Sequence, residues 1–343
     1  MRKWICVATV ALVVMGCGSS MVGPDPDSDP EAVFETFWES YDRYYAHFEI
    51  KDLDWDAIYD EYRPQVDAST TDDELFEIMA QMLTYLQDGH VYLVGGDRRA
   101  LSNTEIRASS TNFDRNLVRT QYVSEVNSSL DDDRITYGHI GESTGYIALS
   151  TLSGGYGRGE NTTGWITEME RAVEVLSDSE AMILDLRNNG GGRAYNSKYV
   201  AGFFATERRP FLMTRSRSGP EHDEFSDPRT WYVEPIPDVH FDGPVVVLTN
   251  RRTFSAAEWL TIALRQYDHV VHMGTHSGGG LAMFLPRELP NGWMHTISVQ
   301  DTRSIEGRTY ERVGVGPHIH LENGADSSGD AMLDRALQYL EGP

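Results

Sequence analysis

Up to residue 90 the chain repeats apolar residues with the period of amphipathic helices. Aromatic and aliphatic side chains recur every three to four positions over residues 33–41 and again over residues 55–62, so each set falls on one face of a helix. A polar stretch at residues 69–72 then offers N-cap side chains for a third helix that continues to Leu86. The pattern therefore predicts a helical subdomain over residues 31–90.

From residue 145 onward the pattern changes to short apolar runs separated by amphipathic segments. Strand-like runs alternate with helical segments in the order 146–149, 164–177, 181–186, 194–204, 245–248, 255–266 and 270–273. Alternation of this kind is typical of parallel strands joined by crossover helices. We therefore predict an α/β domain over residues 145–343, in which residues 281–285 and 294–299 add strands and residues 329–341 form a closing helix.

The stretch between these two parts, residues 91–144, is mostly polar. It contains three β-like runs, at residues 91–94, 117–126 and 134–137. We predict a small β-rich connecting region here, because short runs of this length bounded by polar residues are typical of strands.

The start of the chain has the pattern of an export signal. Two basic residues precede an apolar stretch over residues 4–15, which is too short to remain as a bilayer-spanning helix. The stretch ends in Val14-Met15-Gly16-Cys17, which resembles the bacterial lipobox, where cleavage leaves a lipidated N-terminal cysteine. An ordinary cleaved signal with an incidental cysteine is the alternative. We predict a lipoprotein signal peptide over residues 1–16, lipid on Cys17, a flexible tether over residues 17–30, and a place in the bacterial cell envelope, at the periplasm or outer membrane.

Charge and cysteine content narrow the classes of function. The 53 acidic residues outnumber the 29 basic ones, which gives a net charge of −24 and argues against nucleic acid and anionic lipid surfaces as partners. The two cysteines are Cys6, which would leave with the signal, and Cys17, which would carry lipid. A disulfide, a redox dithiol and a cysteine nucleophile are therefore excluded. Lysine occurs only at positions 3, 51 and 198.

Two segments end apolar runs with residues suited to chemistry. The run at 181–186 leads into Gly190-Gly191-Gly192, where glycines allow a sharp turn that exposes amide N–H groups to an anion. A phosphate loop is not matched, since no Gly-Lys-Ser/Thr follows, and a plain strand-to-helix turn is the alternative. The run at 245–248 leads to Ser255 at the start of a helix, where the alternative is that Ser255 or Thr253 only caps that helix.

A third segment, Asp88-Gly89-His90, ends the helical subdomain. Together the three segments resemble the tail-specific, C-terminal processing serine peptidases of family S41 and their tricorn-core relatives. The resemblance covers most of the chain and rests on four strings in the family's order: Leu86 to His90, Leu184 to Gly191, Thr253 to Glu258, and Glu311 to Pro317. It implies an α/β fold with a ClpP/crotonase-like crossover, a mostly parallel sheet core and an N-terminal helical subdomain.

The family divides by the base that activates its serine. In the processing branch this base is a lysine downstream of the serine, but residues 255–343 contain none. The resemblance therefore implies the tricorn-like branch, in which Ser255 is the nucleophile, His90 the base and Glu311 the acid that completes the site. His276, in the loop that replaces the lysine segment, is the alternative base. Too few residues separate His90 from residue 145 for the PDZ domain that processing peptidases carry there.

The remaining implications concern the oxyanion, cofactors and substrate. The tetrahedral intermediate needs two donors, for which the resemblance implies the backbone N–H groups of Ala256 and of Gly191, preferred over Gly190. His318 and His320 alternate along one extended segment, which favours a half-exposed strand over a zinc site, so no metal or cofactor is expected. We predict an exported serine endopeptidase acting on peptides or unfolded proteins. A non-catalytic protein of the same fold that binds a hydrophobic ligand or peptide is the alternative.

Overall fold

The computed structural model describes residues 28–342 except residues 112, 129–133, 155–162 and 325–327. The predicted signal peptide, Cys17 and most of the predicted tether lie outside the described residues. None of the helices within the described residues combines the length and the apolarity needed to cross a bilayer.

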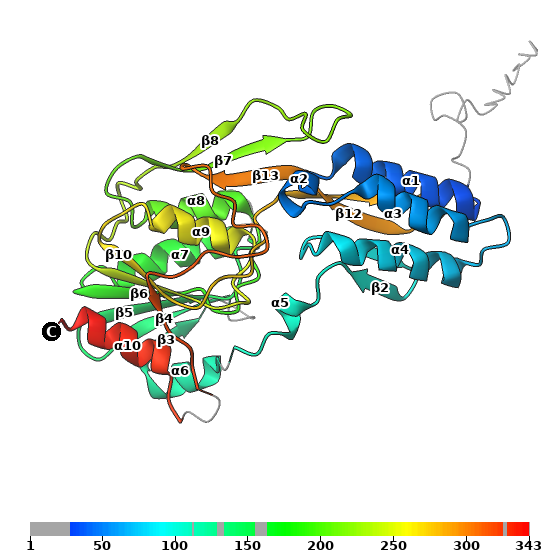
Figure 1. Ribbon diagram of the computed structural model, residues 1–343. Helices are drawn as coiled ribbons and strands as arrows, with labels where there is room; N and C mark the ends of the chain where they lie inside the picture. Colours follow the sequence, from blue (N-terminus) through cyan, green and yellow to red (C-terminus); the bar gives the residue numbers. More distant parts are fainter. Residues whose placement is uncertain (1–27, 112, 129–133, 155–162, 325–327, 343) are drawn as a thin grey trace, which may run out of the picture.

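The N-terminal part is helical, as predicted (Figure 1). Its elements are α1 (Pro30–Tyr44), α2 (Phe48–Lys51), α3 (Trp55–Tyr62), the short 3₁₀ helix η1 (Arg63–Gln65) and α4 (Asp72–Leu86). Helix α4 begins with a capping box, in which Thr71 and Glu74 satisfy each other's free backbone N–H groups. The apolar faces of these helices bury one aromatic-rich cluster, which includes Phe37, Tyr41 and Trp55.

The α/β domain is built on a seven-stranded sheet of order β14-β10-β9-β6-β5-β4-β3. The strands are β3 (Val123–Ser128), β4 (Ile135–Ile140), β5 (Thr144–Leu149), β6 (Ala181–Asp185), β9 (Val245–Thr249), β10 (Val270–Gly274) and β14 (Ile319–His320). Pairing is parallel from β14 through β5 and antiparallel across β4 and β3. The predicted mostly parallel α/β sheet is therefore confirmed.

Helices cover both faces of this sheet. Alternate residues of each strand point to opposite sides, so each face presents its own set of apolar side chains for helices to cover. Helices α7 (Thr163–Val175), α8 (Ala194–Gly202) and α9 (Ala256–Leu264) pack on the face formed by residues such as Leu184 and Val247. Helices α6 (Arg115–Gln121) and α10 (Ala331–Leu340) pack on the opposite face, on Ile183 and Val246. Figure 1 shows the resulting layers.

Two smaller sheets join the parts of the chain differently from the sequence prediction. One has the order β11-β12-β1-β2, in which β1 (Tyr92–Gly95) pairs with β2 (Arg98–Leu101) and with β12 (Met294–Ser298), and β12 also pairs with β11 (Phe284–Glu288). The other has the order β13-β7-β8, with β7 (Arg209–Ser216), β8 (Arg229–Val233) and β13 (Gln300–Ser304). Residues 284–298 were predicted to belong to the C-terminal domain. In the structure they form two strands of the sheet beside the N-terminal helices.

The predicted connecting region over residues 91–144 is therefore not one unit. Strands β1 and β2 belong to the sheet beside the N-terminal helices, whereas β3 and β4 extend the large sheet. Between them lie two helices, α5 (Glu105–Ala108) and α6. The predicted strand at residues 117–126 begins as helix α6, because the Asp114 carboxylate accepts the free N–H groups of Asn116 and Leu117 and fixes a helix N-terminus there.

Candidate active site

Ser255 lies in the turn between β9 and α9, at the carboxyl end of the parallel strands. Its backbone has φ 59° and ψ −124°, a conformation that non-glycine residues rarely adopt outside functional turns. Ser255 and Glu258 form a capping box at the start of α9, in which the Glu258 carboxylate accepts the Ser255 N–H at 2.9 Å. The Thr253 hydroxyl does not cap α9, since it accepts from the N–H of Asn250 and donates to the Leu186 carbonyl. The structure therefore does not support the capping alternative for Thr253.

The Ser255 hydroxyl is hydrogen-bonded to His90, with 2.9 Å between Oγ and Nε2. The backbone of His90 is held on both sides. Its N–H donates to Asp88 Oδ1 at 2.9 Å, and its carbonyl accepts from the Thr296 hydroxyl at 2.7 Å. Because Thr296 belongs to β12, the strand that returns to the N-terminal part fixes the histidine opposite the serine. The two predicted residues are thus brought together from 165 positions apart in sequence.

The imidazole of His90 is packed between two aromatic rings. It stacks on Phe284 with 5.0 Å between ring centroids and lies 4.7 Å from the ring of Phe254. Burial lowers the pKa of His90 below its ordinary value, although nearby Asp88 and Glu311 act in the opposite direction. A neutral imidazole with its Nε2 lone pair facing a hydroxyl is the arrangement that a general base requires.

The alternative base, His276, is not at the serine. Its ring packs against Gly316, where a Cβ atom would come within 2.8 Å of the imidazole. It lines a separate cavity of about 480 Å³ together with His320 and Glu322. No lysine within the described residues is hydrogen-bonded to Ser255, which agrees with the lysine-free segment noted in the sequence.

Two backbone amides lie next to the serine. The N–H of Ala256 begins α9 and has no acceptor within the helix. Gly191 packs directly on the turn, with φ 93°, and a Cβ there would lie 2.7 Å from Ser255 Cβ and 2.6 Å from the Phe254 carbonyl oxygen. Only glycine fits that position. The N–H of Gly191, however, donates to Asn189 Oδ1 at 2.9 Å, whereas the exposed amide of Gly190 has no hydrogen-bond partner among the described residues.

A buried ion network holds the glycine loop in place. Arg187 donates to Asp185, the last residue of β6, and to both carboxylate oxygens of Asp330 at 2.7 Å. All three side chains are buried. Asp185 and Arg187 thus form a buried structural pair, and Asp330 at the start of α10 extends it.

Glu258 is a further residue that positions the nucleophile. Its carboxylate is fully buried and accepts four hydrogen bonds, from the N–H groups of Ser255, Gly279 and Gly280 and from the Ser277 hydroxyl. Burial raises its pKa to about 7, against the lowering effect of these bonds. The sequence carries a signal for this role, because a Glu three residues after a Ser at a helix start has capping-box spacing.

We expect Glu258→Gln to destabilise the protein by about 2 kcal/mol or more when measured above pH 7, where Glu258 is ionised. The glutamine NH₂ group cannot accept, so two donors lose their partner, and each unsatisfied buried group costs about 1–3 kcal/mol. Urea unfolding monitored by tryptophan fluorescence measures the change. Glu39→Gln, at an exposed position of α1, is the matched control. Equal unfolding midpoints for both variants would contradict this role.

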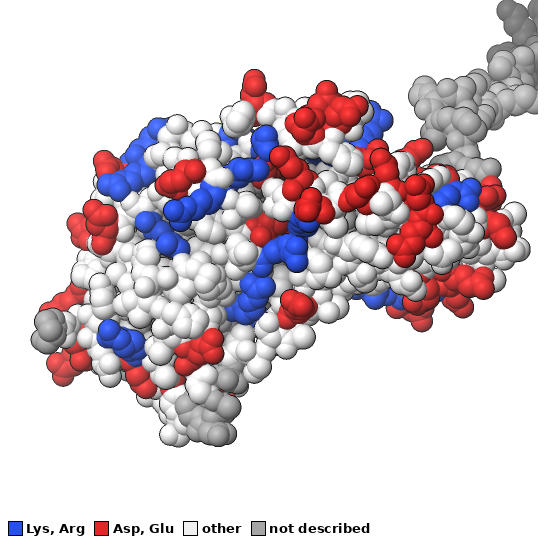
Figure 2. All heavy atoms as spheres, viewed as in Figure 1, with Lys and Arg blue, Asp and Glu red and all other residues white. Residues whose placement is uncertain are grey.

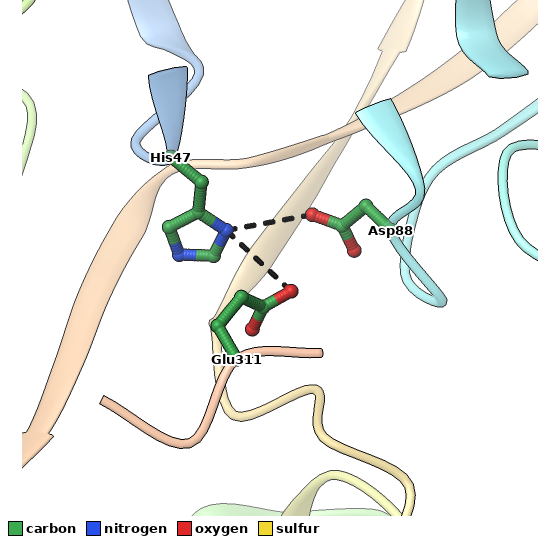
Figure 3. Close-up of side chains that lie close together, drawn as sticks. All are labelled: His47, Asp88 and Glu311. Atoms are coloured by element: carbon green, nitrogen blue, oxygen red, sulfur yellow. Dashed lines mark ion pairs between the residues drawn. The ribbon is translucent and has the colours of Figure 1, made fainter. Parts of the chain in front are cut away.

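Behind His90 lies a cluster of buried charged side chains that the sequence prediction did not assemble. Figure 3 shows His47, Asp88 and Glu311 converging from three separate segments. The Nδ1 atom of His47 is 3.6 Å from Asp88 Oδ2 and 3.7 Å from Glu311 Oε1. Lys51 Nζ lies 3.5 Å and 3.3 Å from the same two oxygens. It also donates to the Leu86 carbonyl and the Tyr45 hydroxyl, each at 2.8 Å.

The hydrogen-bond pattern indicates that His47 is protonated. Its Nε2 lies 3.1 Å from the Gln300 carbonyl oxygen, which can only accept, so Nε2 carries a proton. An unprotonated Nδ1 would then point its lone pair at two carboxylates. Although burial opposes a charge, Glu311 and Asp88 raise the pKa of His47 above 6.5. Burial also opposes the charge on Asp88, but Lys51 and His47 hold the pKa of that carboxyl well below its usual range.

Three side chains of this cluster carry donor atoms of the kind that bind metal ions. The ligand atoms of His47, Asp88 and Glu311 lie within 4.8 Å of one another, a spacing that would suit a cation. Lys51, however, places its ammonium within 3.5 Å of the carboxylate oxygens that would bind the ion. Two cations cannot share those oxygens, so the cluster does not fit a metal site.

Glu311, the predicted acid, belongs to this cluster. No carboxylate within the described residues lies within 4.0 Å of a ring nitrogen of His90, and His90 Nδ1 is buried without a hydrogen-bond partner. Glu311 therefore acts on His90 through its charge and not through a direct hydrogen bond. Its contacts are with His47 and Lys51.

Comparison with known proteins adds family and structural similarity. The model of peptidase family S41 matches residues 143–321, and the model of the tricorn protease C1 domain matches residues 26–84. The carboxy-terminal processing protease CtpB of Bacillus subtilis is 27% identical over 192 residues, covering 51% of this chain and 36% of the relative. The carboxyl-terminal-processing protease of Synechocystis sp. is 26% identical over 250 residues, covering 71% of this chain and 53% of the relative. The chain thus spans only about a third to a half of these relatives.

Solved structures resemble the whole described fold. A crystal structure of a peptidase candidate from Parabacteroides merdae has a TM-score of 0.81 at 27% identity, covering 92% of this chain and 97% of that one. Mature CPAF in complex with lactacystin has a TM-score of 0.67 at 12% identity, covering 91% and 97%. At 12% identity, the similarity to mature CPAF shows a shared fold alone.

Proposed function

Because the chain belongs to peptidase family S41, we propose that it is a serine-type endopeptidase that hydrolyses peptide bonds of unfolded proteins or peptides. The observation that carries this proposal is the 2.9 Å hydrogen bond between Ser255 Oγ and His90 Nε2. Homology to carboxy-terminal processing proteases supports a protease of this family.

The proposed reaction begins with His90 as general base. As Ser255 Oγ attacks the peptide carbonyl, its proton passes to His90 Nε2, which then delivers it to the leaving amine. A water molecule activated by the same nitrogen hydrolyses the acyl-enzyme and restores the serine. The oxyanion is stabilised by the N–H of Ala256 and, in place of the predicted Gly191, by the N–H of Gly190, since the Gly191 amide is already bonded to Asn189.

The imidazolium formed during the reaction needs compensating charge. Asp88 and Glu311 supply it, since both carboxylates favour the protonated form of His90. His47 and Lys51 hold the two carboxylates in place through the contacts given above, and they keep the pKa of Asp88 well below its usual range. In this proposal Glu311 keeps the supporting role predicted for it, but it acts on His90 through its charge and without a hydrogen bond to the ring.

We expect kcat/KM for peptide hydrolysis to fall as the pH is lowered, with a midpoint below 6.5. Burial lowers the pKa of His90 from 6.5, so the histidine stays neutral, and competent as a base, until the pH drops below that value. A pH–rate profile with an internally quenched peptide measures the midpoint. An acid limb centred above 6.5 would contradict His90 as the base in this environment.

Labelling with a fluorophosphonate probe tests the proposed function directly. The expected result is a covalent adduct on Ser255, identified by mass spectrometry of the labelled peptide, and its loss in Ser255→Ala and His90→Ala. The probe requires only an activated serine, so no substrate need be known. Absence of an adduct on folded protein between neutral and mildly basic pH would overturn the proposal in favour of a non-catalytic binding protein.

We also propose that the protein is exported and held in the cell envelope by lipid on Cys17. The support is the lipobox-like string at residues 14–17. Expression of the full chain in a bacterial host, followed by membrane fractionation, tests this. The protein should sediment with membranes, and Cys17→Ser should release it. Equal distributions of both forms would overturn the lipid anchor.

A further inference from the structure

Phe284 is a large apolar side chain that stays exposed beside the proposed base. It lies on β11, the edge strand of its sheet, where all five residues are exposed. The side chain is 38% exposed, yet its ring stacks on the imidazole of His90, with 5.0 Å between the centroids and 26° between the planes. An exposed side chain gains little from burial, so core packing does not account for a phenyl ring at this place.

The strand pairing places this ring over His90. Strand β12 lies between β11 and β1, and β1 begins two residues after His90. From β12, the Thr296 hydroxyl donates to the His90 carbonyl. Ser298 lies two residues further, on the same face of β12, and directly opposite Phe284 in the register. Because the Ser298 side chain is small, the phenyl ring can reach across β12, and one hairpin holds both the backbone and the ring of His90.

The other face of the imidazole is covered by a tightly packed ring. Phe254 lies 4.7 Å from His90 between ring centroids. Three glycines pack on it so closely that a Cβ atom on any of them would lie 2.7 Å or less from a ring atom of Phe254: Gly89, Gly278 and Gly280. The second side-chain torsion of a histidine has broad minima, so contacts on both faces are needed to keep Nε2 directed at the serine. Phe284 supplies the second of these contacts.

Shielding from water also matters at this place in the molecule. Acidic side chains gather over the helical part of the protein (Figure 2), and helix α4 of that part ends just before His90. Negative charge near a histidine favours the protonated form, which cannot act as a base. Burial has the opposite effect, since His90 is only 6% exposed and this burial lowers its pKa. The Phe284 ring covers one face of the imidazole and contributes to that burial.

We propose that Phe284 is a positioning residue for His90: its ring fixes the imidazole in the orientation that directs Nε2 at the Ser255 hydroxyl, and it keeps water from the imidazole. The inference rests on the proposed function, since it takes His90 as the base. Phe284 itself transfers no proton and binds no oxyanion. Its removal should therefore change the rate and the pH dependence of the serine's reaction without abolishing that reaction.

The rate at which a fluorophosphonate probe labels Ser255, measured from acidic to mildly basic pH, tests the inference. The probe reports the reactivity of the serine without a peptide-binding step. In Phe284→Ala the rate on the basic plateau should fall by about tenfold or more, since misplacement of a catalytic group costs up to about 10²-fold. Phe284→Leu, which keeps apolar volume without a flat ring, should change the rate in the same direction and serves as a second variant should alanine disturb the fold.

The pH dependence separates positioning of the base from a general effect on structure. In Phe284→Ala the acid limb of the labelling rate should move to higher pH, because water then reaches the imidazole and burial no longer lowers the pKa of His90 as strongly. The charged groups that act on His90 are unchanged in this variant: Asp88, Glu311, His47 and Lys51. A shift of the limb therefore reports the lost cover alone.

Two control variants complete the experiment. Phe284→Tyr keeps the aromatic ring and should restore both the rate and the acid limb. Leu285→Ala removes the neighbouring side chain, which is 49% exposed and points to the opposite face of β11, and should match the native protein. Thermal melting verifies that each variant is folded.

A native labelling rate or a native acid limb in Phe284→Ala would overturn the inference. A rate that Phe284→Tyr does not restore, or an equal loss in Leu285→Ala, would do the same, because either result means a general loosening of β11. Absence of labelling in the native protein would overturn the proposed function instead. The two failures are therefore distinguishable.

Discussion

Replacing Ser255 by alanine is expected to lower the turnover number for peptide hydrolysis by about 10⁴–10⁶-fold. The free energy of unfolding should change by less than about 1 kcal/mol, because the hydroxyl is lost while the backbone of Ser255 keeps its two hydrogen bonds to Glu258 at the start of α9. Alanine and serine share the same steric cost at φ 59°, so the turn itself is preserved. Initial rates with an internally quenched peptide and urea unfolding curves measure the two quantities.

The histidines provide the controls for this result. His90→Ala should lose a comparable share of turnover, and the double variant should lose little more, since residues that act as a unit are not additive. His276→Ala should retain turnover, because that ring packs against Gly316 and not against the serine. Loss of turnover in His276→Ala to the level of His90→Ala, or retained turnover in Ser255→Ala with a large loss of stability, would contradict the assignment.

Local sequence patterns predicted the elements that carry the site but not all of their neighbours. The apolar run before Ser255 and the glycines after residue 186 identified strand-to-helix turns, because both features act within a few residues. Strands β7 and β8 were not predicted, since polar residues interrupt their apolar ones and β7 pairs with β13, which is distant in sequence. Likewise, the side-chain cap at Asp114 turned a strand-like run into α6.

The contact between His90 and Ser255 was predicted only through the resemblance to a family. Nothing in the spacing of the two residues indicates that β12 returns to the N-terminal part and holds His90 through Thr296. The same long-range pairing explains why the cluster around Glu311 was missed. His47, Lys51 and Asp88 come from the ends of α2 and α4, and only tertiary packing brings them to a loop more than two hundred residues later.

Gly191 lies at the site, but the structure suggests a different contribution from the one predicted. The sequence predicted it as an oxyanion donor, a role that the proposed reaction gives to Gly190. The structure adds that its missing Cβ is what lets the loop approach Ser255, and that its N–H is bonded to Asn189. Backbone hydrogen bonds of this kind within a glycine loop are decided by φ and ψ, which residue identity alone leaves open.

The second large effect is expected from Lys51→Met, which should lower the free energy of unfolding by about 3–5 kcal/mol. Methionine fills a similar volume, but the change leaves the carboxylates of Asp88 and Glu311 buried with only His47 as a counter-charge. It also removes the donor to the Leu86 carbonyl, which ends α4. Urea unfolding measures the loss. Lys198→Met, at a partly exposed position on α8, should change stability by less than about 1 kcal/mol.

A second variant separates the charge from the shape of the lysine. If the loss arises from an uncompensated carboxylate, Glu311→Gln in the Lys51→Met protein should restore part of the stability, so the two substitutions together cost less than their sum. The pH profile should respond as well. Lys51 lowers the pKa of His90, so in its absence the histidine binds its proton more readily, and the acid limb of kcat/KM should move to higher pH. An unchanged acid limb and purely additive stabilities would mean that Lys51 serves packing alone, and that the charges behind His90 do not set its basicity.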